Sequence, residues 1–446
     1  MSYYICSMLK NYYQIVIKLI CIFSCFIFGV SSLNAQFLMD AIDTSRTQNE
    51  NKHISFYKKY DRFRISGYLQ PQFQIIESKG AKSYNGGDFS KNTNNRFMLR
   101  RGRLRFDYGR FNDSNELVLE LYFQIDGTER GLVTRDFWGR YFENKYKLFA
   151  ITTGIFARPF GYELNLSSSD RESPERGRMS QILMRTERDI GAMISIEPRK
   201  KDHPLRMLKL DFGFFNGQGL PATADYDSFK DFISRLRVKP ITIAENIQLS
   251  AGLSYLNGGH FQNTKYTYST ILNNNIASIK IDSNQTNVGR KSPRVYSGAD
   301  MQLVFKHKHS TTELRAEYWK GTQTATATTS ETPFALLTEP YYVRQFDGAY
   351  FYLLHTIQQK HQFGIKLDWY DPNTLVTGKQ IGQTGSLFTE ADIKYTTLGL
   401  GYTRFINENL KMIFWYEFVK NETTLLNNYT SDVLDNVFTC RFQYRF

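Results

Sequence analysis

The chain has 446 residues and a formal net charge of +13, and 15% of its residues are aromatic. A positive charge of this size says something about partners rather than about the fold. The basic residues are scattered rather than gathered in runs, which argues against nucleic acid and favours small anions or lipopolysaccharide as partners. After residue 35 no stretch approaches 18 consecutive apolar residues, which excludes a transmembrane helix from that part of the chain.

The first 35 residues are typical of a secretory signal peptide. They contain Lys10 and Lys18, no acidic residue, and an apolar core from Leu19 to Val30. Small residues follow the core, and we expect cleavage after Ala35. The core is shorter than the roughly 20 residues that a spanning helix needs, so a membrane anchor is the weaker interpretation. Three of the four cysteines lie in this leader, and the exported chain keeps only Cys440, which excludes an internal disulfide.

In the rest of the sequence, apolar and polar residues alternate with a period of two. Segments of roughly 10 to 15 residues are apolar at every second position, and Asn, Gly, Asp and Thr separate them. A strand sends successive side chains to opposite faces, so one face of each segment suits lipid and the other suits water. The candidate strands are 62–76, 95–110, 115–127, 132–143, 146–157, 189–197, 206–216, 230–240, 246–257, 294–308, 309–320, 344–355, 358–371, 391–405, 408–420 and 436–446.

This pattern predicts an all-β fold, a transmembrane antiparallel β-barrel of about 16 strands over residues 62–446. An even number of strands leaves no backbone edge unpaired in lipid, and a barrel of this size encloses an aqueous channel. We expect residues 36–61 to form an N-terminal periplasmic segment. The strands of a soluble β-sandwich would also show alternating apolar and polar residues. Here, however, the alternation continues over residues 62–446 without a domain break, which favours the barrel.

The end of the sequence supports a membrane barrel. Phe438, Cys440, Phe442, Tyr444 and Phe446 share one face of the last candidate strand. This pattern resembles the C-terminal signal by which outer-membrane barrels are recognised for assembly. We therefore expect the barrel assembly machinery to engage Phe446, and we expect outer-membrane lipid and lipopolysaccharide of a Gram-negative bacterium to surround the barrel.

The strand expected at 95–110 carries the most informative basic pattern. Its apolar positions share one parity and suit lipid: Met98, Leu104, Phe106 and Tyr108. The opposite parity sends Arg101, Arg103 and Arg105 into the lumen, about 7 Å apart along the wall. A guanidinium stays protonated, and its forked donors match phosphate oxygens. In the alternative interpretation, acidic residues of the next strand pair with these arginines in a structural salt lattice.

The third outer connection, residues 158–188, is unusually long and rich in both signs of charge. Its apolar residues need a surface to pack on, which favours folding into the barrel and narrowing the channel over a loop extended into solvent. Further basic residues of the candidate pore lie on this connection and on the strand expected at 230–240. They are Arg158, Arg171, Arg176, Arg178, Arg185, Arg188, Arg235 and Arg237.

Several short motifs carry a family resemblance: Gly67–Gln72, Arg100–Leu104, Gly154 with Arg158–Glu163, Ser167–Ser169, Glu175–Arg176, Arg188–Gly191 and Trp369–Thr374. Together they resemble the phosphate-selective porins O and P. The resemblance implies a sixteen-stranded barrel, usually a homotrimer, whose third loop folds into the pore and whose arginine ladder leads anions to a constriction. Arg101, Arg103 and Arg105 match the arginine-rich strand of that family. The third connection here contains no Lys, and its acidic residues nearly balance its arginines.

The sequence thus predicts an outer-membrane porin, a passive water-filled channel for small anions such as phosphate or polyphosphate. A general, non-selective diffusion porin is the alternative, because loop conformation sets the bore. A barrel enzyme or an adhesin is a weaker alternative: His307, His309 and His355 lie in or beside short turns, and no nucleophile-elbow or phosphate-loop motif is present. We expect no catalytic residue, no metal, no cofactor and no nucleic-acid partner.

Overall fold

The computed structural model describes residues 63–222 and 224–446, and the predicted signal peptide and the segment 36–61 lie outside this range. The described residues form one sheet of 18 strands. The strands are β1 (Phe63–Ile76), β2 (Asn95–Phe111), β3 (Leu117–Thr128), β4 (Gly131–Phe142), β5 (Phe149–Ala157), β6 (Arg188–Ile196), β7 (Leu208–Phe215), β8 (Asp231–Ala244), β9 (Ile247–Phe261), β10 (Thr267–Asn273), β11 (Ile276–Asp282), β12 (Lys291–Lys306), β13 (Ser310–Ala325), β14 (Tyr341–Ile357), β15 (His361–Asp371), β16 (Tyr395–Phe405), β17 (Leu410–Asn421) and β18 (Val437–Arg445). Short helices are α3 (Arg178–Leu183), η2 (Gln285–Asn287), η3 (Gly378–Gln380) and η4 (Glu390–Asp392).

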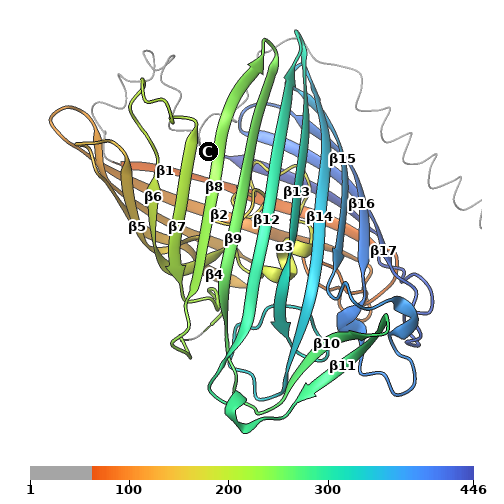
Figure 1. Cartoon of the computed structure of the whole chain (residues 1–446). Helices are drawn as coiled ribbons and strands as arrows, with labels where there is room; N and C mark the ends of the chain where they lie inside the picture. The colour runs from red at the N-terminus through yellow and green to blue at the C-terminus, as the bar shows by residue number, and fades with distance from the viewer. Residues whose placement is uncertain (1–62, 223) are drawn as a thin grey trace, which may run out of the picture. The chain divides into compact units, whose positions relative to one another are not determined.

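Sixteen of these strands close into an antiparallel barrel (Figure 1). Each of the sixteen pairs with its neighbour along the chain, and β1 pairs with both β2 and β18, which closes the circle. Strands β10 and β11 lie outside the circle because β9 pairs directly with β12. The predicted all-β barrel of about sixteen strands is confirmed, and each candidate range overlaps one barrel strand.

Strands β10 and β11 form a hairpin within the connection between β9 and β12, where no strand was predicted. The two residues of its turn, Asn274 and Asn275, both have positive φ, 50° and 63°. Two-residue hairpin turns favour asparagine and glycine for this reason. The hairpin also runs beside β14 in parallel over residues 267–269. The Asn-Asn pair between two short segments with β-branched and aromatic residues was the signal that could have identified it.

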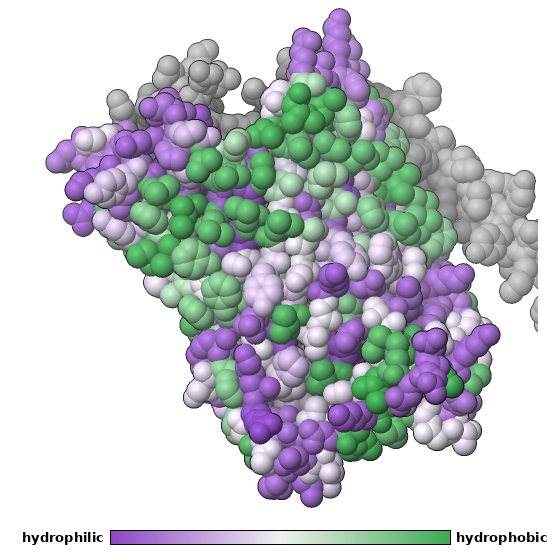
Figure 2. Space-filling model, in the orientation of Figure 1, coloured by the Kyte–Doolittle hydropathy of each residue, from purple (hydrophilic) through white to green (hydrophobic). Residues whose placement is uncertain are grey.

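The barrel is polar inside and apolar outside. In β15, Phe363, Ile365 and Leu367 are exposed, whereas Lys366 and Asp368 between and beside them are buried. We call the face with the buried polar side chains the inner face. Figure 2 shows hydrophobic residues gathered over the strands and hydrophilic residues toward the ends of the molecule. An outer apolar band around a polar interior is the arrangement of barrels that are surrounded by lipid. Among the described residues, no helix is both long and apolar enough to cross a membrane.

A β-bulge interrupts the pairing of β1 with β2. The register shifts between Gln70 and Pro71, so that Arg100 is an extra residue in β2. Proline has no N–H to donate to the ladder, which suits a bulge. The bulge reverses the inward and outward parity on either side of it. The prediction that Met98 faces lipid is therefore wrong: its sulfur accepts a hydrogen bond from the inner-face Gln72 amide at 3.1 Å.

The barrel closes at a seam between its first and last strands. The N–H of Phe446 donates to the carbonyl oxygen of Gly67, and the N–H of Gly67 donates to the carbonyl oxygen of Phe446, both at 3.0 Å. A Cβ atom on residue 67 would lie 2.6 Å from the Phe446 ring, so only glycine leaves room for it. The aromatic residue at position 446 is thus packed on the opposite strand of the seam.

Candidate functional site

The segment between β5 and β6, residues 158–187, is largely buried and includes α3. Its apolar side chains pack with inner-face aromatic residues in one cluster, in which Phe160 meets the Trp319 ring edge-on at 4.7 Å. Its backbone also bonds to inner-face side chains: for example, Lys411 Nζ donates to the carbonyl oxygen of Ser169 at 2.6 Å. Hydrogen bonds of this segment reach β1, β9, β13, β14, β17 and β18.

Glu175 of this segment is held by three arginines. Its carboxylate lies 2.8 Å from Nε of Arg100, 2.6 Å from Nη2 of Arg101 and 3.0 Å from Nη2 of Arg441. The bulge is what lets the consecutive residues Arg100 and Arg101 reach the same carboxylate. Burial alone would raise the pKa of Glu175, but the three guanidinium groups outweigh it and hold the pKa well below its usual range. Glu175 is therefore ionised at any physiological pH.

Two further acidic residues of the segment are held in the same way. Glu187 lies 3.0 Å from Arg135 and 3.3 Å from Arg176. Burial opposes ionisation of Glu187, and the surrounding guanidinium groups again keep its pKa well below the usual range. Glu172 forms a two-pronged pair with Arg315 of β13, at 2.8 and 2.9 Å. The acidic residues of the segment thus anchor it to arginines of several strands.

Three arginines of the segment, Arg158, Arg171 and Arg178, form no ion pair with a carboxylate within the described residues. Arg171 is 2% exposed, and its Nε and Nη1 atoms have no hydrogen-bond partner there, while Nη2 reaches the carbonyl oxygen of Leu166 at 3.3 Å. Burial, and then the nearby Arg101, lower the pKa of Arg171. Burial and Arg294 lower the pKa of Arg158 to about 10. Arg158 and Arg171 remain protonated at neutral pH, and the carboxylates that act on them, such as Asp189 on Arg158 and Glu163 on Arg171, lie beyond ion-pair distance.

The arginine ladder predicted on β2 lies on the inner face, but its members are paired. Arg101 binds Glu175, and Arg103 lies 3.1 Å from Asp126 of β3. Arg105 is only partly buried and bonds to Asp107 of its own strand at 2.6 Å. The alternative left open by the sequence, pairing with acidic residues of the next strand, is observed for Arg103, whereas Arg101 pairs with the segment 158–187 and Arg105 with its own strand.

The remaining candidate residues are divided among several partners. Arg188 pairs with Asp136 at 3.0 Å, Arg235 pairs with Asp300 at 2.9 Å, and Arg185 pairs with Glu331 at 3.0 Å. Arg176 pairs with Glu187, as described above. Like Arg158 and Arg171, the candidates Arg237 on β8 and Arg178, which stacks on aromatic rings, have no carboxylate within ion-pair distance in the described range.

In the structure, Arg101, Arg171, Arg176 and Arg188 lie close together around the segment 158–187. Arg235 of β8 lies apart from them and pairs with Asp300. Sequence reasoning did not select Arg100 as a site residue, because strict alternation points it outward. The Pro71 position inside a strand was the signal that could have revealed the bulge. In the described range, no group of three or more His, Cys, Asp or Glu is arranged to hold a metal ion.

Comparison with known proteins shows the fold. No family model matches the sequence, and no curated protein matches it. The anion-selective porin from Comamonas acidovorans superposes with a TM-score of 0.51 at 9% identity, over 86% of this chain and 99% of that one. The outer membrane channel DcaP of Acinetobacter baumannii gives a TM-score of 0.50 at 12% identity, over 86% of this chain and 97% of that one. The chain therefore has the fold of outer-membrane porins.

Proposed function

We propose that this protein is an outer-membrane porin that passes small anions by passive diffusion through a water-filled channel. The observation that carries the proposal is the closed sixteen-strand barrel, apolar outside and lined with charged side chains inside. A barrel of this strand number is wide enough for an aqueous channel. The porin fold of the two solved structures supports the same conclusion at the level of the fold.

The segment 158–187 is proposed to fold into the barrel and to narrow the channel. Its hydrogen bonds to inner-face residues of six strands support this placement. Three acidic residues, Glu172, Glu175 and Glu187, fasten it to arginines of the wall. Buried ion pairs with several hydrogen bonds restrict a loop far more than exposed pairs do. We infer that the segment is a fixed constriction and sets the bore.

The proposed preference for anions rests on the arginines that form no ion pair within the described residues. Arg158 and Arg171 carry permanent charges with unpartnered N–H groups, and Arg237 has no ion pair in the part of the chain that the structure describes. In a narrow passage, such excess charge concentrates anions and repels cations. Guanidinium donors match phosphate oxygens, so phosphate or polyphosphate is the anion class that we propose. The resemblance to phosphate-selective porins points in the same direction.

The test is ion selectivity in a planar lipid bilayer. The full chain is refolded in detergent, inserted, and its reversal potential is measured across a KCl gradient. Millimolar phosphate is then added and the chloride current recorded. An anion-selective reversal potential with block of the current by phosphate supports the proposal. Cation selectivity contradicts the proposed selectivity, and the absence of any conductance contradicts the channel itself.

A general diffusion porin is the second candidate, because most inner-face arginines are paired. Arg101, Arg103, Arg188 and Arg235 each have a carboxylate partner, which reduces the field that a passing ion meets. This candidate predicts a permeability ratio near one and no effect of phosphate. For either candidate we propose a homotrimer in the outer membrane, export by the signal peptide at 1–35, and assembly guided by Phe446. Chemical cross-linking of the refolded barrel tests the trimer.

A further inference from the structure

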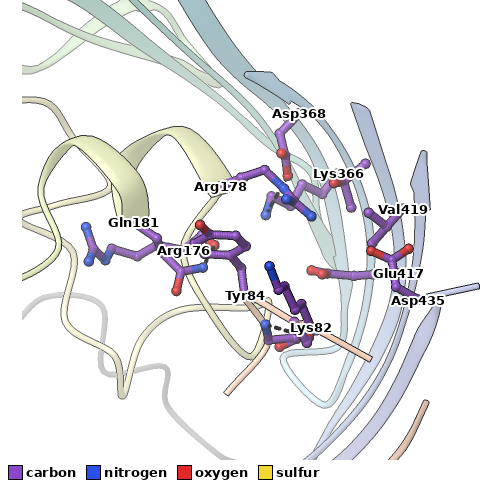
Figure 3. A pocket seen from close by; sticks show the side chains of 13 residues that line it. Lys82, Tyr84, Arg176, Arg178, Gln181, Lys366, Asp368, Glu417, Val419 and Asp435 are labelled. Carbon is purple, nitrogen blue, oxygen red and sulfur yellow. Dashed lines mark hydrogen bonds and ion pairs between the residues drawn. The ribbon is translucent and has the colours of Figure 1, made fainter. Parts of the chain in front are cut away.

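Charged side chains inside the barrel lie beside groups of the opposite sign. In the small pocket next to α3, Arg178 and Lys366 lie among the carboxylates of Asp368, Glu417 and Asp435 (Figure 3). Lys366 and Asp368, for example, are 2.8 Å from each other. The outer face of β15 and β16 differs, because it carries a cation that has no such partner among the described residues.

The outer face of β15 and β16 carries four pairs of residues, with one side chain from each strand in every pair. Counted from the short turns that precede β15 and follow β16, the pairs are His361 with Arg404, Phe363 with Tyr402, Ile365 with Leu400 and Leu367 with Leu398. The first pair is polar, the second is aromatic, and the last two are aliphatic. The aliphatic side chains are 39–46% exposed. This order matches the layers of a lipid monolayer from headgroup to acyl chain.

Arg404 is held at the end of this face without an acidic partner. No carboxylate of the described residues lies within ion-pair distance of its guanidinium, which is partly exposed. Its Nη1 donates to Nε2 of His361, and Nδ1 of His361 lies 2.8 Å from the hydroxyl of Tyr402. The Nε and Nη2 groups of Arg404 donate to no described residue. These two N–H groups form one edge of the guanidinium, the geometry that matches two oxygens of a phosphate.

The turns around Arg404 add positive charge. Lys308 of the β12–β13 turn and Lys360 of the β14–β15 turn form no ion pair within the described range. Backbone hydrogen bonds of 2.8 Å join the β14–β15 turn both to the β12–β13 turn and to the end of β16. The acidic residue nearest to Arg404 along the chain is Glu408, which is exposed in the β16–β17 turn and lies beyond ion-pair distance of it. This part of the rim is therefore positively charged.

The aromatic pair indicates the depth of Arg404 in the membrane. The rings of Phe363 and Tyr402 lie 5.3 Å apart, and Tyr402 also stacks on Phe414 of β17 at 6.4 Å. Aromatic residues of this kind gather where the hydrocarbon meets the headgroups. Arg404 follows Tyr402 by two residues on the same face, which places it about 7 Å nearer to the turns. The guanidinium thus lies at the level of the lipid phosphates.

We propose that the outer face of β15 and β16 binds an anionic phospholipid of the periplasmic leaflet. Its phosphate accepts hydrogen bonds from Nε and Nη2 of Arg404, and its acyl chains lie on the two aliphatic pairs. Short turns mark the periplasmic end of such barrels, so the headgroup belongs to the inner leaflet. The inference rests on the proposed place of the barrel in the outer membrane and is independent of what the channel carries.

The charge of the rim selects among phospholipids. A zwitterionic lipid offers the same phosphate, but its ammonium group would approach Lys308 and Lys360 and be repelled. A lipid with a net negative charge is attracted by the same two side chains. Phosphatidylglycerol should therefore bind more tightly than phosphatidylethanolamine.

The test counts bound lipids by native mass spectrometry of the full chain, refolded in detergent. The chain is titrated in turn with phosphatidylglycerol and phosphatidylethanolamine that carry the same acyl chains. We expect the first lipid to bind roughly fivefold more tightly or better when it is phosphatidylglycerol, since one basic residue near an anionic lipid contributes about this factor. Millimolar inorganic phosphate, which lacks acyl chains, should not displace it. Because binding is measured in detergent, failure of the channel and failure of this site are separate results.

Two variants locate the site. Arg404→Gln should remove most of the preference for phosphatidylglycerol. Arg110→Gln is the matched control, because Arg110 lies on the outer face of β2 at the same end of the barrel, but the turn that follows it carries Asp113 and Glu116. Those carboxylates repel an anionic headgroup, so Arg110→Gln should bind the lipid like the unmodified chain. A heat-dependent shift in gel mobility confirms that each variant has formed the barrel.

Four results overturn the proposal. The first is equal binding of the two lipids by the unmodified chain, and the second is an unchanged preference in folded Arg404→Gln. The third is displacement of the lipid by inorganic phosphate, which means a site for free anions. The fourth is a change in the number of chains per particle in Arg404→Gln, because this face would then contact a second copy of the chain.

Discussion

Replacing Glu175 with glutamine removes the acidic centre of the arginine cluster while keeping the shape of the side chain. In the structure, this carboxylate is within 3.0 Å of three guanidinium groups, from Arg100, Arg101 and Arg441. Glu175→Gln leaves all three charges on the inner face without a counterion. Breaking a buried ion pair from one side typically costs about 3–5 kcal/mol, because the remaining charge stays desolvated. We therefore expect a less firmly anchored segment and a more positive passage.

The size of the electrical effect can be estimated. One unit of charge changes the energy of a monovalent ion about 7 Å away by about 0.6 kcal/mol, even at the dielectric constant of water. This is close to RT, so anions in the passage become about threefold more concentrated and cations about threefold less. The ratio of anion to cation permeability should then rise by roughly sevenfold or more, since the passage is less polarisable than water.

The assay is the reversal potential of single channels across a KCl gradient, with Glu339→Gln as the control for loss of a negative charge away from the passage. Open-channel conductance should rise as well, because the segment 158–187 loses its strongest anchor. An unchanged permeability ratio in folded Glu175→Gln would refute the reasoning, since it would mean that ions do not pass near this cluster.

Two other substitutions have defined outcomes. Arg171→Gln removes a buried charge that forms no ion pair within the described residues, so phosphate block should weaken about tenfold without loss of thermal stability; a lower unfolding temperature in the gel-shift assay contradicts this. Gly161→Ala should destabilise the barrel by about 2 kcal/mol or more, because φ is +63° and the new Cβ overlaps the Glu317 carboxylate; an unfolding temperature equal to that of the unmodified chain contradicts it.

The barrel strands could be predicted because a membrane barrel separates apolar and polar side chains with a strict period of two. The strand expected at 95–110 is observed at Asn95–Phe111, and the last one, expected at 436–446, at Val437–Arg445. The hairpin of β10 and β11 was not predicted from the sequence, because its strands are short and both of their faces are partly exposed to solvent. A pattern of exposure toward lipid is absent from a hairpin that lies outside the barrel circle.

The candidate site could be predicted less completely. The alternation of inward and outward positions along a strand correctly placed Arg101 and Arg103 on the inner face, where they are buried. It could not place Arg100, because a bulge shifts the parity by one residue. Nor could it pair Arg101 with Glu175, since that contact depends on how a long connection folds rather than on any local period.

The seam between Gly67 and Phe446 has a consequence for the order of events in assembly. Strand β1 precedes all other strands along the chain, yet one of its two neighbours, β18, follows all of them. Until β18 arrives, an edge of β1 presents unpaired N–H and C=O groups, which lipid cannot satisfy. A partly made barrel must therefore be shielded or held outside the hydrocarbon until its final strand is in place. Pairing of β1 with β18 is thus the step that closes the barrel, and loss of the last strand leaves the other strands in an open sheet.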